Sequence, residues 1–572
     1  MSDRLPLFSL FRLDRLTIWL LSMMLIACSI QPGIERSAGQ SSAAIETEAA
    51  MDTTDTASTP EALNILNARQ ALLQRQAEQA LDLLPATMVA AIAEEELRKE
   101  ARLLRIEALS LLGRNITAVQ EHLLLAEDLN ATQRIDNNND IWELLSGIPA
   151  NAPAASTVQI DSYELRGWLE LLAVINTRRH NIPAQIQAVT QWQDKWNQHS
   201  ASKNLPAAIA FVHQAWQDRA QHIALLLPLA EPAGIAVQEG FLAAYYQALA
   251  QGLPVPRISV HDTSRLRDVM PVYRRAVEQQ ADLVIGPLNK DLVRQLQGQR
   301  ALPIPTLALN YGDKDRLTPG EFYQFGLAPE DEIMQTADLA WAAGHRNAAI
   351  LTPTGEEYRR ILETFSQHWG SLGGELVAQG SFSNNSSYAD TIRQMMGIDA
   401  SEARAASLRS LLPRNTMHFI PRRRKDIDFL FLLANPAEGR QLKPALSFYY
   451  AGDVPVYAMP AIYDGGLNST ANRDLNTIRF IDSPWILQPD NTLRLTVDSL
   501  WPTGNSAVQR LRAMGIDSYN LYPRLTQLAR FPDTRLPGNT GILYMEPDGS
   551  IHRQLLTAQF INGAAVVNQV SP

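Results

Sequence analysis

The single cysteine, Cys28, is the only thiol that the chain offers for covalent modification. One cysteine cannot form an internal disulfide. It follows the apolar residues 16–27, and Arg4, Arg12 and Arg15 precede them. A basic segment before about 12 apolar residues is typical of a signal peptide, because a membrane span needs ~20. The pattern therefore predicts export, with the cysteine directly after the signal.

Residues 25–28, Leu-Ile-Ala-Cys, resemble the lipobox of bacterial lipoproteins. There the cysteine thiol receives a diacylglycerol, and cleavage leaves the cysteine as the new N-terminus. The alternative is an ordinary signal peptide with a chance cysteine. Ser29 is not the aspartate that retains such lipoproteins in the inner membrane. We therefore expect a lipid anchor at Cys28 in the outer membrane, facing the periplasm, and acylation would make the attachment stable.

One motif of cell-wall enzymes occurs, at Ser200-Ala-Ser-Lys203. The S-x-x-K motif places a nucleophilic serine one helical turn from a lysine, and it requires a K-T-G strand to orient the substrate. No lysine of the chain is followed by Thr-Gly or Ser-Gly. Pro206 ends the stretch, and we expect a surface loop. Ser383 and Asn385 form an S-x-N without a partner motif.

Other catalytic patterns are missing from the sequence: G-x-S-x-G, H-E-x-x-H, the Walker loop and G-x-G-x-x-G. His261 and Asp262 are adjacent on an expected strand. Neighbouring strand side chains face opposite ways, so these two are poorly placed for a proton relay, and we interpret His261 as structural. We expect no enzymatic activity, no metal and no cofactor.

Composition indicates a globular chain of several domains. With 572 residues the chain exceeds the size of a single core, and 46% hydrophobic against 19% charged residues is ordinary for folded protein. The net charge of −10 argues against nucleic acid as a partner. We divide the chain into a signal peptide (1–27), a tether (28–59) poor in large apolar residues and hence flexible, a helical domain (60–218) and a two-lobed domain (219–572).

The helical domain is expected to begin at Thr59-Pro60-Glu61, where threonine suits the N-cap and proline the first turn. Apolar residues then recur at helical spacing. Helix pairs of this kind resemble tetratricopeptide repeats, and an irregular bundle is the alternative. The tryptophans are interpreted as core or groove residues: Trp142, Trp168, Trp192, Trp196 and Trp216. Helices are expected at residues 60–84, 97–111, 117–129, 140–145, 163–178, 184–197 and 207–220.

From His222 onward, short apolar strands alternate with helices, which predicts doubly wound α/β sheets. A hairpin is expected at the end, pairing residues 541–545 with 555–560 through the turn 547–549. The predicted fold class is thus α plus α/β: a tetratricopeptide-like helical domain, then a two-lobed domain of the type I periplasmic-binding-protein kind. Strands are expected at 223–229, 255–260, 283–285 and 304–309 in one lobe, and at 348–351, 376–382, 429–433 and 454–459 in the other.

With these features assembled, nearly the whole chain resembles the LpoA family of penicillin-binding protein activators. The resemblance implies an outer-membrane lipoprotein that docks on a class A, bifunctional penicillin-binding protein through its two-lobed domain. Docking would stimulate peptidoglycan synthesis, chiefly transpeptidation. Besides Cys28, the matching segments are 223–229, Glu239-Gly240-Phe241, 281–288, 325–330, 428–433 and 541–549.

The alternative is a solute-binding lipoprotein that holds a small ligand or wall fragment between its lobes. Amino-acid receptors of this fold bind a carboxylate at a helix start after the third strand. Here residues 286–289 are Gly-Pro-Leu-Asn, and Pro287 donates no N–H. Glu356 and Glu357 open the facing helix and would repel an anion. We therefore expect a cleft unsuited to amino acids and no small-molecule ligand of that kind, with a wall fragment or a cationic ligand as the alternative.

A basic run, Arg422-Arg423-Arg424-Lys425, follows Pro421. Such a run is usually a solvated loop. The alternative interpretation is a basic patch that attracts an acidic surface of a partner protein by electrostatic steering.

Overall fold

A computed structural model describes residues 59–148, 162–178, 181–314, 316–383, 387–411, 418–466, 469–489, 491–502 and 504–567. The described part up to Gln217 is helical. The helix expected at 60–84 is two helices, because Arg75 takes a positive φ of 57° between them. The helix α5 ends at Leu111, the end expected from the sequence, and Gly113 with φ 69° follows it. The helices are α2 (Pro60–Leu73), α3 (Ala77–Leu83), α4 (Ala86–Ala91), α5 (Glu95–Leu111), α6 (Asn115–Leu125), η1 (Ala126–Asp128), α7 (Ala131–Ser146), α8 (Tyr163–Thr177), α9 (Ile182–Lys195), α10 (Ser200–Lys203), α11 (Ala207–Ala210) and α12 (Val212–Gln217).

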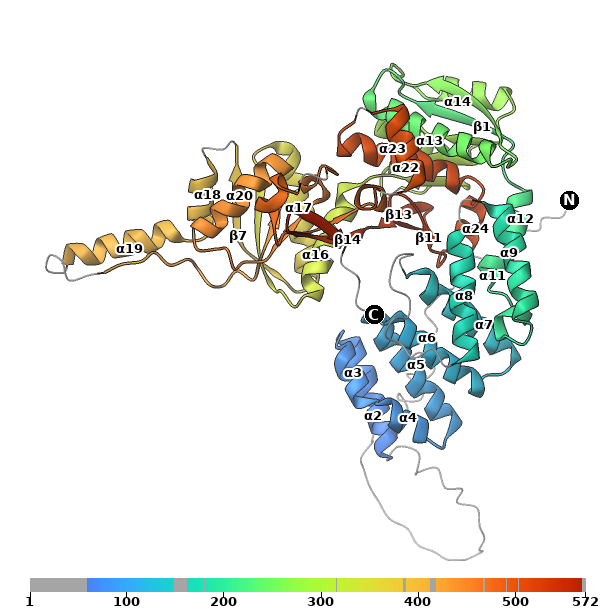
Figure 1. Cartoon of the computed structure of the whole chain (residues 1–572), viewed down its shortest axis with the longest axis horizontal. Helices are drawn as coiled ribbons and strands as arrows, with labels where there is room; N and C mark the ends of the chain where they lie inside the picture. Colours follow the sequence, from blue (N-terminus) through green and yellow to red (C-terminus); the bar gives the residue numbers. More distant parts are fainter. Residues whose placement is uncertain are drawn as a thin grey trace, which may run out of the picture. The chain divides into compact units, whose positions relative to one another are not determined.

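The first sheet has eight strands in the order β11-β12-β13-β5-β4-β3-β1-β2. Of these strands, Figure 1 labels β1, β13 and β11. From β2 to β13 neighbouring strands are parallel, and β12 and β11 add antiparallel pairs. Every residue of β1 is buried, as the apolar run predicts for a central strand. The elements are β1 (His222–Leu227), α13 (Pro232–Ala250), β2 (Arg257–Asp262), α14 (Met270–Glu278), β3 (Leu283–Ile285), α15 (Lys290–Gln297), β4 (Thr306–Ala308), β5 (Phe322–Phe325), β11 (Leu536–Pro537), β12 (Ile542–Met545) and β13 (Ser550–Gln554).

The second sheet has seven strands in the order β15-β14-β10-β9-β8-β6-β7. Its central strands β6 and β8 are buried almost throughout, and β14 and β15 run antiparallel at one edge. The elements are α16 (Pro329–Ala342), β6 (Asn347–Pro353), α17 (Glu356–Ser371), β7 (Glu375–Phe382), α18 (Tyr388–Met395), α19 (Ile398–Leu411), β8 (Phe429–Leu432), α20 (Pro436–Phe448), β9 (Val456–Ala458), η3 (Pro460–Ile462), η4 (Ala471–Leu475), β10 (Arg479–Asp482), α21 (Pro484–Leu487), β14 (Leu556–Ile561) and β15 (Ala564–Val567).

The expected terminal hairpin is wrong in its pairing. β12 pairs with β13 through the turn at Gly549, and both belong to the first sheet. β14, the segment expected as the hairpin's second arm, pairs with β10 and β15 in the second sheet. Leu555 alone separates β13 from β14, so the chain passes from one sheet to the other there. Local apolar pattern indicates strands but does not select their partners.

The chain crosses between the sheets at two further places. After β5 it enters α16, and after β10 it returns to the first sheet through α22 (Thr492–Leu500) and α23 (Ser506–Leu521). α23 packs on α13 at very short range, because Gly240 and Gly515 each face a backbone carbonyl of the other helix. The fold class expected from the sequence, a helical region followed by two α/β lobes, is confirmed.

Buried polar contacts join the helical region to the first lobe. The buried Arg524 precedes α24 (Leu525–Arg530) and donates to Gln185 Oε1 on α9 at 2.7 Å. Gln527 Nε2 donates to the carbonyl of Ala208 at 2.7 Å, and the rings of Phe211 and Phe531 meet edge to face. None of the described helices is both long and apolar enough to pass through a bilayer.

Candidate functional site: the polar network between the sheets

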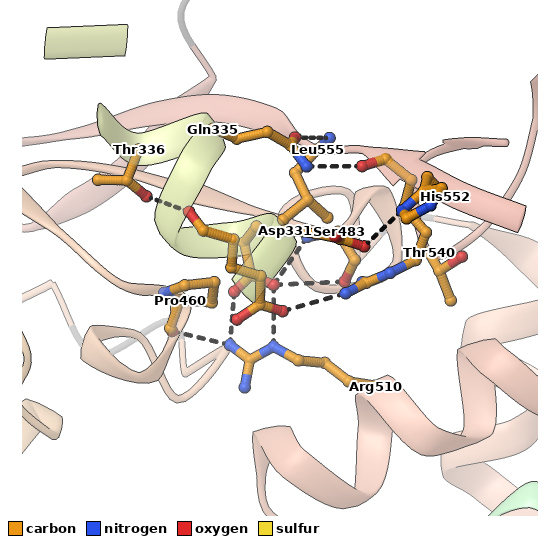
Figure 2. Close-up of polar contacts among 12 residues, drawn as sticks. Asp331, Gln335, Thr336, Pro460, Ser483, Arg510, Thr540, His552 and Leu555 are labelled. Carbon is orange, nitrogen blue, oxygen red and sulfur yellow. Dashed lines mark hydrogen bonds and ion pairs between the residues drawn. The ribbon is translucent and has the colours of Figure 1, made fainter. Parts of the chain in front are cut away.

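Ligands of two-lobed α/β proteins bind between the lobes, beyond the carboxyl ends of the strands. In this chain a network of charged side chains occupies the places where the backbone crosses between sheets (Figure 2). Its members come from α16, the end of β10, α23 and β13. The network is therefore the first place to test for a ligand or a reaction.

Asp482 and Arg510 form the central ion pair of the network. Asp482 ends β10 with 1% of its side chain exposed. Arg510 on α23 donates from Nε to Asp482 Oδ1 at 2.9 Å and from Nη2 to Oδ2 at 2.6 Å. The same Nη2 donates to the carbonyl of Pro460 at 2.9 Å (Figure 2). Asp482 Oδ1 also accepts from the Ser483 N–H at 2.7 Å, so both charges are compensated from within the protein.

A second ion pair joins α16 to β13. Arg553 Nη2 donates to Glu332 Oε1 at 3.2 Å. Burial raises the pKa of Glu332, and the charges of Arg553 and Arg510 oppose that rise. Gln335, one turn along α16, donates to the carbonyl of Arg553 at 2.7 Å and accepts from the N–H of Leu555 at 2.9 Å (Figure 2). These contacts hold the crossing at Leu555 against α16, the first helix after the chain leaves the first sheet.

A third contact pairs Asp331 with His552. The imidazole Nδ1 lies 3.0 Å from Asp331 Oδ2, and this hydrogen bond raises the pKa of His552. The ring of Tyr311 stacks on the imidazole with 5.4 Å between centroids, and its hydroxyl donates to the Ile551 carbonyl at 2.7 Å. The Asp331 carboxylate at this edge of the network therefore also has a partner within the protein.

Asp517 on α23 is a further buried carboxylate whose hydrogen-bond donors lie in the segment before β12. Its fully buried carboxylate accepts four hydrogen bonds of 2.7–2.9 Å, from the N–H and side-chain amide of Asn539 and from the N–H and hydroxyl of Thr540. Burial nonetheless raises the pKa of Asp517. With its own donors in place, this carboxylate is occupied in fixing the segment before β12.

The network can clamp the crossings but offers no reaction. Its carboxylates are bound to arginines, a histidine or backbone donors, and no serine or cysteine nucleophile adjoins a free base among them. Within the described ranges, no three His, Cys, Asp or Glu side chains are grouped so that they could hold a metal ion. Sequence reasoning missed these residues. Their only local signal is charge within apolar surroundings, as in Arg479-Phe-Ile-Asp482 and Ile551-His-Arg553.

The residues that would face an anionic ligand between the lobes already have partners within the protein. Asn289 caps α15, and its side-chain oxygen accepts from the N–H groups of Asp291 at 2.9 Å and Leu292 at 3.4 Å. Glu356 at the start of α17 is exposed and pairs with Arg359. For Glu357 the side chain lies outside the described set. The N–H groups at this helix start, which would bind the carboxylate of a ligand, therefore already donate to the side chain of Asn289.

The S-x-x-K residues are not in a loop, contrary to expectation. Ser200–Lys203 form the one-turn helix α10. Ser200 Oγ donates to Glu164 Oε2 at 2.7 Å, and its N–H donates to the same carboxylate. His199, just before, is buried among aromatic rings, accepts from the Ala201 N–H at Nδ1 and contacts the Glu164 carbonyl with Nε2 at 2.8 Å. The motif anchors a turn, and its serine contacts a carboxylate.

The other candidate residues have structural contacts. Asp262 accepts from the N–H groups of Leu229 and Ser264, each at 3.0 Å, and forms no described bond with His261. Ser383 lies in a bend after β7, and Asn385 is outside the described residues, as is Cys28. Of the five tryptophans interpreted as core or groove residues, Trp216 is half-buried and stacks with Arg219. The other four are buried: Trp142, Trp168, Trp192 and Trp196.

The basic run is only partly available to a partner. Arg423 is buried and donates to Asp453 Oδ2 at 2.7 Å. Arg424 Nε donates to Asp426 Oδ1 at 2.7 Å. Arg422 and Lys425 are exposed. Two of the four cations are therefore neutralised locally.

Known proteins place the chain in a family. The family model described as "LppC putative lipoprotein" matches residues 24–563. A protein of Photobacterium profundum named penicillin-binding protein activator LpoA is 27% identical over 462 residues, covering 80% of this chain and 75% of the relative. The protein of the same name from Vibrio vulnificus is 27% identical over 476 residues, covering 80% and 76%.

A solved structure agrees at the level of the fold. Haemophilus influenzae LpoA in a monoclinic crystal form superposes with a TM-score of 0.50 at 21% identity, covering 89% of this chain and 94% of that chain. The family match spans the helical region and both sheets. The chain therefore belongs to the LppC lipoprotein family, the family of the penicillin-binding protein activators named LpoA.

Proposed function

We propose that this chain docks on a class A, bifunctional penicillin-binding protein and stimulates peptidoglycan synthesis, chiefly the transpeptidase step. The observation that carries the proposal is the family match over residues 24–563, with relatives named penicillin-binding protein activators over 80% of the chain. A match of this extent includes the helical region and most of both lobes rather than one lobe.

The chain acts by contact and not by catalysis. Support comes from the site: the charges between the sheets are paired with one another, and the serine of the S-x-x-K motif donates to Glu164. A solute-binding role finds less support, because Asn289 fills the helix start that would receive a carboxylate. The protein thus stimulates a separate enzyme.

The lipid anchor belongs to the same proposal. The lipoprotein family match includes the lipobox region, since it begins at residue 24. We infer that residues 1–27 are removed, that Cys28 carries the lipid in the outer membrane, and that residues 28–59 act as a tether. The helical domain (60–218) and the two-lobed domain (219–572) then stand in the periplasm within reach of a synthase.

The decisive experiment is reconstitution. The full-length chain in detergent is added to a purified class A penicillin-binding protein with lipid-linked substrate, and crosslinked muropeptides are quantified. We expect the crosslinked fraction to rise with added chain, and to stay unchanged with a synthase whose transpeptidase serine is blocked by penicillin. No binding and no change in crosslinking would contradict the proposal. Saturable micromolar binding of labelled amino acids or wall peptides would instead favour the solute receptor.

A further inference from the structure

The helix α19 and the segment that returns from it, residues 418–425, form a protrusion of the second lobe, here named the α19 arm (Figure 1). On the C-terminal side of the buried Ala405, every residue of α19 (406–411) is exposed. Leu408 is 51% exposed, Leu411 81% and Ile420 57%. The arm therefore presents large apolar side chains to solvent at its far end.

The base of the arm is firmly attached. Arg393 on α18 pairs with Asp399 at 3.0 Å and with Glu402 at 2.6 Å, both near the start of α19. The N–H of Arg424 donates to the Met396 carbonyl at 2.9 Å, and the N–H of Arg422 donates to Ser401 Oγ at 3.2 Å. The returning segment thus lies along the first turns of α19 and fixes its direction.

The arm is basic in a chain of net charge −10. Residues 398–411 and 418–425 hold six basic and two acidic side chains. Both acids are bound to Arg393, and two of the cations, Arg423 and Arg424, pair with acids of the lobe. Within the described ranges no ion pair involves Arg404, Arg409 or Arg422. Lys425 is 76% exposed and lies 3.8 Å from Asp453.

The exposed side chains of α19 are sorted by face. Arg404, Leu408 and Leu411 are spaced i, i+4 and i+7, which places them on one side of the helix. Arg409 instead lies over the ring of Phe419, at 5.6 Å from its centroid, on the side of the returning segment. The outer face thus combines apolar anchors with a positive charge, the pattern of a helix that inserts into a groove of another protein.

This pattern fits a protein better than a membrane or the wall polymer. A helix that lies in a bilayer surface needs a continuous apolar face, and α19 has two leucines on its outer face over 14 residues. An anionic glycan would match the arginines but would leave the leucines in water. An apolar groove with an acidic rim satisfies both features at once.

We propose that the α19 arm is the docking element for the synthase, with Leu408 and Leu411 entering an apolar groove whose rim carries carboxylates that face Arg404 on the outer side of the helix and Arg409 on the adjoining side. The proposal rests on the proposed function for the identity of the partner. It adds which surface of this chain is used and what chemistry the partner surface must have. Electrostatic attraction then accelerates encounter, and the leucines slow dissociation.

The test measures association of the full-length chain in detergent with a purified class A penicillin-binding protein, at low and high salt. The first arm variant is Arg404→Glu with Arg409→Glu, and the second is Leu408→Ser with Leu411→Ser. Matched controls on other exposed helix surfaces are Arg274→Glu with Arg275→Glu on α14, and Leu495→Ser with Leu500→Ser on α22, whose leucines are 59% and 62% exposed. Because all these side chains are exposed, melting temperatures should stay within a few degrees of the parent.

We expect the arginine variant to lower the association rate at low salt by ~10-fold and to flatten its salt dependence. The leucine variant should speed dissociation by ~10-fold or more, with both controls at the parent values. Parent-like kinetics of both arm variants, with intact binding by the parent chain, would overturn the arm and leave the proposed function standing. A parent chain that does not bind the synthase would overturn the proposed function itself. Loss in the arm variants of binding to anionic vesicles or sacculi, or of self-association, with synthase binding unchanged, would also overturn the docking proposal.

Discussion

Removing Arg510 should destabilise the two-lobed part of the chain strongly. In the Arg510→Met variant, Asp482 keeps its 1% exposed carboxylate but loses both charged hydrogen bonds, of 2.9 and 2.6 Å. Only the N–H and hydroxyl of Ser483 remain as described donors to it. Breaking a buried pair by removing one partner costs about 3–5 kcal/mol, because the other charge stays buried and unpaired. A loss of 3 kcal/mol lowers the folding equilibrium constant by more than ~100-fold.

The size of the effect is checked by urea unfolding of the full chain, followed by circular dichroism. The informative comparison is the double variant Arg510→Met with Asp482→Leu, which removes both charges. Replacing a whole buried pair by apolar residues is often close to neutral, so the double variant should regain most of the lost stability. If Arg510→Met changes the free energy of unfolding by less than about 1 kcal/mol, or if the double variant is no better than the single one, the network is not a clamp and the reasoning is refuted.

Further outcomes follow from other parts of the structure. Burial lowers the pKa of His122 and of His199 below the usual value of about 6.5. As the pH falls below about 6.5, the unfolded chain therefore binds these protons before the folded chain does, and the free energy of unfolding of the helical region should decrease. Thermal melts at pH 7.5 and 5.5 check this, and replacing both histidines by glutamine should reduce the dependence; equal melting temperatures of the helical transition would contradict it. In Gly240→Ala the added Cβ would clash with the Arg512 carbonyl and should cost several kcal/mol of stability, whereas Gly370→Ala on α17, where nothing lies within 4 Å, should add about 0.5–1 kcal/mol. Similar melting temperatures for the two variants would contradict the close packing of α13 on α23 at Gly240. Cys28→Ser should abolish lipid attachment and release the chain from the outer-membrane fraction; mass spectrometry of an unmodified Cys28 in the parent would refute the anchor.

Secondary structure was largely accessible from the sequence, since periodicity depends on neighbours close in the chain. The strand at Leu283–Ile285 and the end of α5 at Leu111 lie where the pattern predicts them. The expected helix at 60–84 failed because Arg75 adopts a left-handed conformation that its residue type does not favour. The Ser200 turn was predicted as a loop because its stabilising partner, Glu164, lies 36 residues away.

The composition, the lone cysteine after its apolar segment and the alternation of strands and helices are local properties, and they determined the class of protein and the kind of fold expected. The tertiary structure alone decided which strands pair at the end of the chain, and which charges are compensated. Asp331 and His552 are 221 residues apart, and Arg512 bonds Glu239 across 273. Such partners are brought together by the crossings between sheets, and no short-range pattern encodes them because burial and charge pairing are set by the assembled core.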